Sequence, residues 1–162
     1  MDFQKLLPNM IRAAKLEPQL YEEVEHDQDA TIPAGAVVVL ASALSGLGAL
    51  FTMGLGGFLQ VIFSALFGWA VWSVIIFFVG TKLFEGKADV GEMLRVLGFA
   101  YTPMCLGIIP FLGWLVGSVW TIIAIVVATR QGLDVSTGKA VAAILIGLPV
   151  YIVIAILMAI VF

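Results

Sequence analysis

The fold is decided by residues 66–130, which read LFGWAVWSVIIFFVG (66–80), TKLFEGKADVGE (81–92), MLRVLGFAYTPMCLGIIP (93–110) and FLGWLVGSVWTIIAIVVATR (111–130). The first block ends an apolar segment that begins at Phe58, and the last block is an apolar segment of its own. Each is near the roughly 20 residues that a helix needs to cross a bilayer. The charges of the second block would cost about 2.5–3.5 kcal/mol each at bilayer depth, so this turn lies in water.

Composition supports the same interpretation. Of the 162 residues, 62% are hydrophobic and only 12% are charged, whereas a soluble domain is nearer half apolar. The chain therefore has to be solvated by lipid. The single cysteine, Cys105, excludes an internal disulfide and is expected to pack as a small apolar residue. No basic patch of the kind that binds nucleic acid is present.

For the chain on both sides of this stretch, we predict an all-α membrane bundle of five transmembrane helices over residues 34–162. The expected spans are residues 34–53, 58–80, a helix from Asp89 to the turn at 107–110, 111–129, and a last helix capped by Ser136 or Thr137. Gly54, Gly56 and Gly57 are expected to break the chain between the first two spans.

Residues 1–33 are predicted to form a cytoplasmic tail that contains an amphipathic interfacial helix and an acidic linker. The helix starts near Lys5 and ends before Pro18, with Leu7 and Ile11 on its apolar face and Arg12 and Lys15 facing the membrane interface. Three roles stay open for it: packing on the protein's own cytoplasmic face, anchoring to anionic lipid, or docking to a partner. The segment 19–33 is acidic and holds few large apolar groups, so we expect a solvated linker.

Several residues are expected to shape the helices. Asp89 and Glu92 have the spacing of a capping box. Pro103 should weaken the third helix by freeing the carbonyl of Phe99, with Tyr101 and Thr102 as local hydrogen-bonding partners, and Pro149 should kink the last helix. Trp69 and Trp72 are expected to pack between helices. The small residues expected at helix contacts are Gly46, Gly113 and Gly117.

Arg95 lies one turn into the third helix. Its long side chain can reach the headgroups or Glu92 as an interfacial anchor, or it can act as a buried functional cation; the sequence leaves both open.

The placement of the cations predicts the orientation. With five spans, all eight lysines and arginines fall on one side of the membrane: Lys5, Arg12, Lys15, Lys82, Lys87, Arg95, Arg130 and Lys139. The positive-inside rule then places the N-terminus in the cytoplasm and the C-terminus on the far side. A prokaryotic inner membrane is the expected location.

The predicted spans contain no Asp, Glu or His, although ion-coupled transporters hold their coupling ion with such groups. Sequence motifs of hydrolases and metalloproteases are missing as well. His26, the only histidine, lies in the acidic tail, where a metal site is not expected. We therefore predict no catalytic residues, no cofactor and no metal site, and the protein is not expected to be an enzyme.

The order of these features resembles the Yip1 domain family in its prokaryotic form. The resemblance rests on the charged turn before Leu94-Arg95-Val96-Leu97-Gly98-Phe99-Ala100-Tyr101-Thr102-Pro103, on Ile109-Pro110, and on Trp120 in the next span, and it covers roughly residues 34–160. It implies a five-span membrane fold, and Arg95, Gly98, Tyr101 and Pro103 belong to the motif that carries it. Eukaryotic relatives are trafficking proteins that bind prenylated GTPases and associate with one another; this chain has a shorter tail and lacks a clear Asp-Leu-Tyr-Gly-Pro-type motif.

Three functional hypotheses follow. The first is a non-catalytic membrane scaffold or accessory subunit, whose partners are the lipid bilayer and other integral membrane proteins or a second copy of the chain. The second is a transporter or channel for a small or lipidic molecule, with Tyr101 at a gate and Pro103 and Pro149 as bending points; a cavity that reaches the midplane would support it. The third is membrane shaping or trafficking by insertion of the N-terminal helix.

Overall fold

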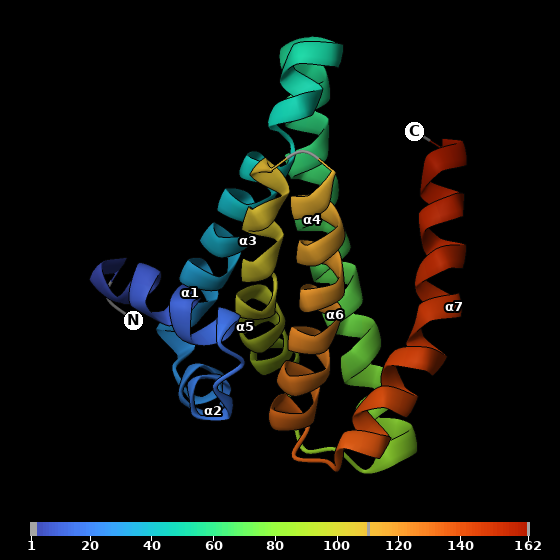
Figure 1. The fold of residues 1–162 in the computed structure, drawn as a ribbon. Coiled ribbons are helices and arrows are strands. Elements are labelled where there is room, and N and C mark those ends of the chain that lie inside the picture. Colours follow the sequence, from blue (N-terminus) through green and yellow to red (C-terminus); the bar gives the residue numbers. More distant parts are fainter. Residues whose placement is uncertain (1–2, 110, 162) are drawn as a thin grey trace.

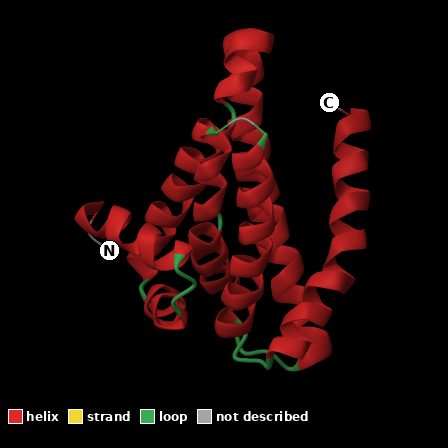
Figure 2. Cartoon of the chain, viewed as in Figure 1, coloured by secondary structure: helices red, strands yellow, loops and turns green. Residues whose placement is uncertain are grey.

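The computed structural model describes residues 3–109 and 111–161, and within them every regular element is a helix (Figures 1 and 2). Two α-helices and two short 3-10 helices precede the bundle. The elements, in chain order, are η1 (Phe3–Lys5), α1 (Leu6–Ala14), α2 (Pro18–His26), η2 (Gln28–Ala30), α3 (Thr31–Ser45), α4 (Leu47–Phe84), α5 (Val90–Ala100), η3 (Thr102–Ile108), α6 (Leu112–Gly132) and α7 (Thr137–Val161).

Four stretches of helix are long and apolar enough to cross a membrane: 28–45, 53–84, 112–132 and 137–158. The prediction of five continuous transmembrane helices is therefore too high by one. The expected third span is instead divided at Tyr101 into α5 and η3. Pro103 explains the division, since proline cannot donate a backbone hydrogen bond within a helix. The Thr102 hydroxyl donates to the freed Phe99 carbonyl at 2.7 Å, as expected.

Local signals elsewhere place the helix ends. The capping box before α5 is confirmed: the Glu92 amide donates to the Asp89 carboxylate at 2.7 Å, and the Asp89 amide donates to the Glu92 carboxylate at 2.7 Å. The first span starts earlier and ends earlier than predicted, because α3 runs from Thr31 to Ser45. The expected glycine break is present at Gly54, whose φ of 71° interrupts α4.

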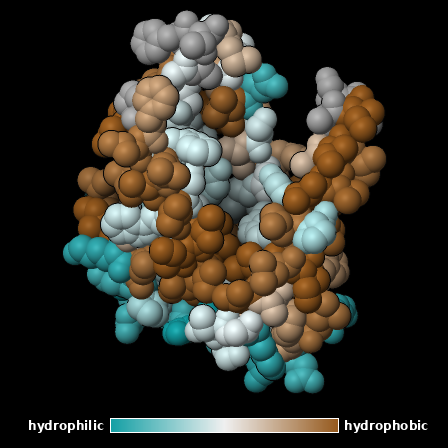
Figure 3. Space-filling view, turned by 45° about the vertical axis from the view of Figure 1, so that its right-hand side comes forward, coloured by the Kyte–Doolittle hydropathy of each residue, from teal (hydrophilic) through white to brown (hydrophobic). Residues whose placement is uncertain are grey.

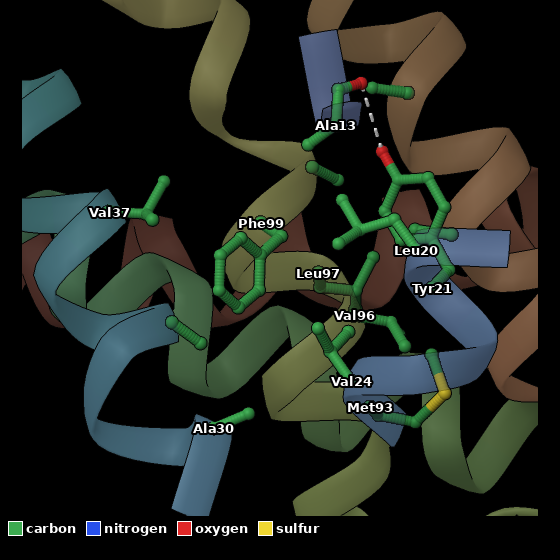
Figure 4. Packing of buried hydrophobic residues seen from close by; sticks show 14 of the residues in the cluster. Ala13, Leu20, Tyr21, Val24, Ala30, Val37, Met93, Val96, Leu97 and Phe99 are labelled. Carbon is green, nitrogen blue, oxygen red and sulfur yellow. Dashed lines mark hydrogen bonds between the residues drawn. The ribbon is translucent and has the colours of Figure 1, made fainter. Parts of the chain in front are cut away.

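The acidic segment after Pro18 is not a solvated linker, so that prediction is wrong. It forms α2, which lies against α5 and α6, and Leu20, Tyr21 and Val24 on one face are fully buried (Figure 4). These three residues are spaced i, i+1 and i+4, so a helix brings them to the same side. The Tyr21 hydroxyl donates to the Ala13 carbonyl of α1 at 3.4 Å. The first two helices therefore belong to the core of the bundle.

Small residues allow close approach inside the bundle. A Cβ on Gly98 of α5 would lie 2.7 Å from the Cβ of Ala34 and 3.0 Å from its backbone on α3. A Cβ on Gly117 of α6 would lie 2.9 Å from the Pro103 carbonyl oxygen of η3, and Gly113 faces Leu106 of η3. Gly46 lies at the end of α3 against Val61 of α4. Only residues without a large side chain fit these positions.

The surface divides into an apolar band and a hydrophilic end. Figure 3 shows hydrophobic residues over most of the bundle and hydrophilic residues gathered at the end that carries the connection between α6 and α7. Trp69 and Trp72 lie between helices rather than at this boundary. The indole N–H of Trp69 donates to the Leu94 carbonyl at 3.0 Å, and Trp72 packs edge-on against Tyr151 with 5.6 Å between ring centroids.

Candidate functional site

Helices α1 and α2 pack against one side of the bundle, on α5, α6 and η3 (Figure 1), and we call residues 6–26 the N-terminal cap. The apolar residues of α1 lie on two faces of the helix. Met10 and Ala13 are buried against the core, whereas Leu7 and Ile11 are 66% and 49% exposed. Lys15 is exposed. The structure thus leaves Leu7, Ile11 and Lys15 available for the membrane interface.

Arg12, which was also predicted to face the membrane interface, is bound by carboxylates of the cap. Its guanidinium forms two bonds with Glu23, at 2.7 and 2.8 Å, and a third with Glu17 at 3.0 Å. The paired bonds are the fork geometry that arginine prefers. They raise the pKa of Arg12 and lower that of Glu23. Arg12 therefore connects α1 to α2.

Arg95 is the residue that fastens the cap to the bundle. Its side chain, 6% exposed, runs from α5 to the last turn of α2. The Nε–H donates to the carbonyl oxygens of Val24 and Glu25, both at 3.0 Å, and an Nη–H also donates to Glu25. A third guanidinium nitrogen lies 3.5 Å from the Thr31 hydroxyl. The expectation that Arg95 reaches the headgroups or Glu92 is therefore wrong.

Elementary helix chemistry explains this arrangement. The last carbonyl groups of a helix lack intrahelical partners and carry partial negative charge, so a cation stabilises them. Many helices end with a glycine that satisfies these carbonyls, but α2 ends at His26 with an extended Asp27. Here the guanidinium of Arg95 binds these carbonyls instead, and it connects segments about 70 positions apart in the chain.

Glu25 is the one carboxylate of the cap that is turned inward. It is 6% exposed, and its Oε2 atom is buried without a hydrogen-bond partner among the described residues. Burial raises its pKa to about 7, and Glu22, Asp134 and Glu92 add to the rise while His26 opposes it. The Nδ1 atom of His26 lies 3.3 Å from Glu25 and 2.9 Å from the Glu22 carbonyl, and both contacts raise the pKa of His26.

These shifts predict that the cap is held more firmly at acidic pH. The folded pKa of Glu25 lies above its ordinary value of 4.5, so the folded protein binds more protons between about pH 4.5 and 7. The stabilisation that this group provides falls as the pH rises through that window, and the raised pKa of His26 acts in the same direction.

We expect Glu25→Gln to weaken the pH dependence of the protection of α2 from proteolysis between pH 5.5 and 8. The exposed variant Glu85→Gln should leave it unchanged, and an equal effect of both variants would contradict this account.

A second feature is a groove in the apolar band, between α4 and α7. Near Gly147, α7 lies close to Ile75, Ile76 and Trp72 of α4. Farther along, where α7 passes Pro149 and bends, the two helices separate (Figure 1), and the space-filling view shows a hollow there (Figure 3). One part of it has a volume of about 650 Å³ between α4 and α7, and another of about 430 Å³ reaches α5 and α6.

Three hydroxyl side chains lie where the parts of this groove meet. Ser64 lines both parts as well as a third cavity of about 650 Å³ toward α3, which Tyr101 also lines. Tyr151 lies against Gly68 of α4, where a Cβ would be 2.7 Å from its hydroxyl oxygen. The remaining walls are mostly aliphatic and aromatic, so the groove suits a lipidic molecule better than water.

The predicted residues fall into separate places. Gly98, Tyr101 and Pro103 follow one another along α5 and η3; Tyr101 faces the cavities, whereas Gly98 and Pro103 face neighbouring helices. Pro149 lies on α7 beside the groove, and Leu7 and Ile11 lie on the cap. Sequence reasoning missed Glu25, Ser64 and Tyr151. Only the spacing of Leu20, Tyr21 and Val24 could have indicated that the acidic segment is a docked helix.

The described residues offer no obvious metal centre: nowhere among them are three His, Cys, Asp or Glu side chains grouped so that they could hold an ion.

Comparison with known proteins agrees with this architecture. The sequence model of the Yip1 domain matches residues 17–160. The match begins just before α2, so it includes the second helix of the cap as well as the bundle. Comparisons with curated proteins and with solved structures gave no significant match. Because the matched region covers nearly the whole chain, the protein belongs to the Yip1 domain family, whose members are generally non-enzymatic membrane proteins.

Proposed function

We propose that this protein is a non-catalytic scaffold or accessory subunit of a larger membrane assembly, and that the N-terminal cap is its docking surface on the cytoplasmic side. The observation that supports this is the fixation of α2 by Arg95. A helix held by a buried cation presents its outer face in one orientation, so less conformational entropy is lost when a partner binds. Glu22, Glu23 and His26 occupy that outer face and are exposed.

The proposal includes a topology. Helix α5 and η3 together run antiparallel to α4 and α6 (Figure 1), and we infer that they complete a fifth crossing between the four candidate spans. Buried backbone that is not α-helical is tolerated at membrane depth where protein surrounds it. The N-terminus is then cytoplasmic and the C-terminus lies on the far side of a prokaryotic inner membrane, in agreement with the positive-inside rule.

Other membrane helices, or a second copy of the chain, fit the apolar faces that the bundle leaves open. Exposed large side chains line α6 and α7 over several turns, among them Leu115, Val119, Ile122, Ile152 and Ile156. Lipid is their default neighbour, and a partner helix can replace it.

The test is purification of the tagged chain from its native membrane in a mild detergent, with mass spectrometry of the proteins that co-purify in fixed proportion. We expect at least one integral membrane partner. Arg95→Met, which frees the cap, should lose most of that partner, whereas Lys87→Met, which changes an exposed cation of the same face, should retain it. Isolation of the wild-type chain alone, or equal yields from both variants, would contradict the proposal.

A further inference from the structure

The groove between α4 and α7 has no part in the proposed scaffold role, because a partner that docks on the cap does not contact it. We therefore considered what the groove itself could bind. It opens to the apolar band, away from the hydrophilic end of the bundle (Figure 3). Its two main parts, about 650 and 430 Å³, lie within the range of about 300–1,000 Å³ typical of small-molecule sites. A ligand would therefore enter from the lipid.

The walls suit a long hydrocarbon chain. From Phe63 to Val71 on α4, and from Tyr151 to Met158 on α7, the lining side chains of the larger part are almost all aliphatic or aromatic. This part follows the two helices as they separate. A chain that lies along it keeps apolar contacts on both sides, whereas bulk lipid contacts a helix on one side only.

Apart from Gln60, which lines the larger part farther along α4, the polar groups of the groove lie at its inner end, near the middle of the membrane. Ser64, Tyr101 and Tyr151 present hydroxyl groups there, and the Nε1–H of Trp72 in the same wall is buried without a hydrogen-bond partner among the described residues. Trp72 precedes Lys82 by ten positions in α4, which places it about 15 Å deeper along the helix. A buried donor without a partner is costly in an apolar medium, so an acceptor on a ligand would stabilise it.

The ligand must also be uncharged. The residues that line the two main parts of the groove carry no formal charge, and an ionised head group at this depth would lack a counter-charge. Ordinary phospholipids keep their charged head groups at the interface, so they do not meet both requirements.

We propose that the groove binds a neutral lipid: one long alkyl or isoprenoid chain with a small uncharged head group that carries a hydroxyl or carbonyl oxygen. The chain lies between α4 and α7, and the oxygen interacts with Tyr101, Tyr151 and the indole N–H of Trp72 after a small rotation of that ring.

The experiment uses the full chain in phosphatidylcholine nanodiscs and a long-chain alcohol that carries a photoreactive diazirine. Cross-links should concentrate on peptides that contain residues 60–72 and 151–158. Unlabelled oleyl alcohol or a short-chain isoprenoid quinone should compete, and whichever competes better identifies the head group. Ionised oleate at pH 9 should compete poorly. Even labelling of all lipid-facing helices, or equal competition by oleate, would overturn the proposal.

Matched variants separate the groove from the general lipid surface. Ala65→Phe places a phenyl ring in the inner part of the groove and should abolish the concentrated cross-links, whereas Val119→Phe places the same ring on the outer face of α6 and should leave them. Tyr151→Phe removes only a hydroxyl group, and Trp72→Phe removes the indole N–H together with part of the ring. Each should weaken competition by about 3- to 10-fold. Unchanged competition in both would overturn the polar part of the proposal. Co-purification of partners is measured separately, so failure of either proposal leaves the other testable.

Discussion

Arg95→Met is expected to release α2 from the bundle and to lower the free energy of unfolding by about 3 kcal/mol. The variant keeps an apolar side chain about as long as the aliphatic part of arginine but removes every hydrogen bond to the Val24 and Glu25 carbonyls. Hydrogen bonds from a charged group contribute about 1.5–3 kcal/mol each, and a cation near a helix C-terminus contributes up to about 2 kcal/mol. Part of this is recovered when the freed carbonyls meet water.

Denaturant unfolding in mild detergent measures this loss, and limited proteolysis locates it. New cleavage sites should lie within residues 17–30, with the membrane helices still protected. Arg95→Lys retains the charge without the planar fork, so we expect an intermediate loss. Lys87→Met, on the exposed turn before α5, serves as the control. A wild-type cleavage pattern in Arg95→Met would show that Arg95 does not hold the cap.

Gly98→Val is expected to separate α5 from α3 and to destabilise the bundle by about 3 kcal/mol. A Cβ at this position would lie 2.7 Å from the Ala34 Cβ and 3.0 Å from its backbone. Backbone atoms cannot rotate away as a flexible side chain can, so one helix has to move. That movement would also disturb Arg95, which lies one turn earlier on the same helix.

The same unfolding measurement tests this prediction. Gly98→Ala should cause a smaller loss, because it adds the clashing Cβ without the branched methyl groups. Gly56→Ala is the matched control, since a Cβ there meets open space and alanine is the better helix former. We expect that variant to be neutral or slightly stabilised. A Gly98→Val protein as stable as Gly56→Ala would show that the two helices do not meet closely.

Features governed by neighbouring residues could be read from the sequence. The capping box of Asp89 and Glu92, the break at Gly54 and the weakening of the helix at Pro103 all depend on a few adjacent positions, and the structure has each of them. The apolar spans could be predicted in the same way, because the length and composition of one segment decide whether it can cross a bilayer. The error in the number of continuous spans also has a local cause, since Pro103 divides the third one.

Features that join distant segments could not be read in this way. The acidic charge of residues 17–29 suggested a solvated linker, but three apolar side chains on one face were enough to dock α2 once α5 and α6 provided a surface. Nothing near Arg95 in the sequence indicates that its partners are carbonyl groups some 70 residues earlier. The groove depends on the angle between α4 and α7, which no single segment determines.

Hydrogen exchange of the wild-type chain in lipid nanodiscs measures whether α2 is a fixed part of the membrane domain. Backbone amides of residues 20–26 should exchange as slowly as those of α5, because both helices share one buried core and open together. The amides of the exposed turn at residues 85–88 provide the fast reference. Exchange of residues 20–26 as fast as that reference would mean that the segment is a solvated linker, and it would contradict this account.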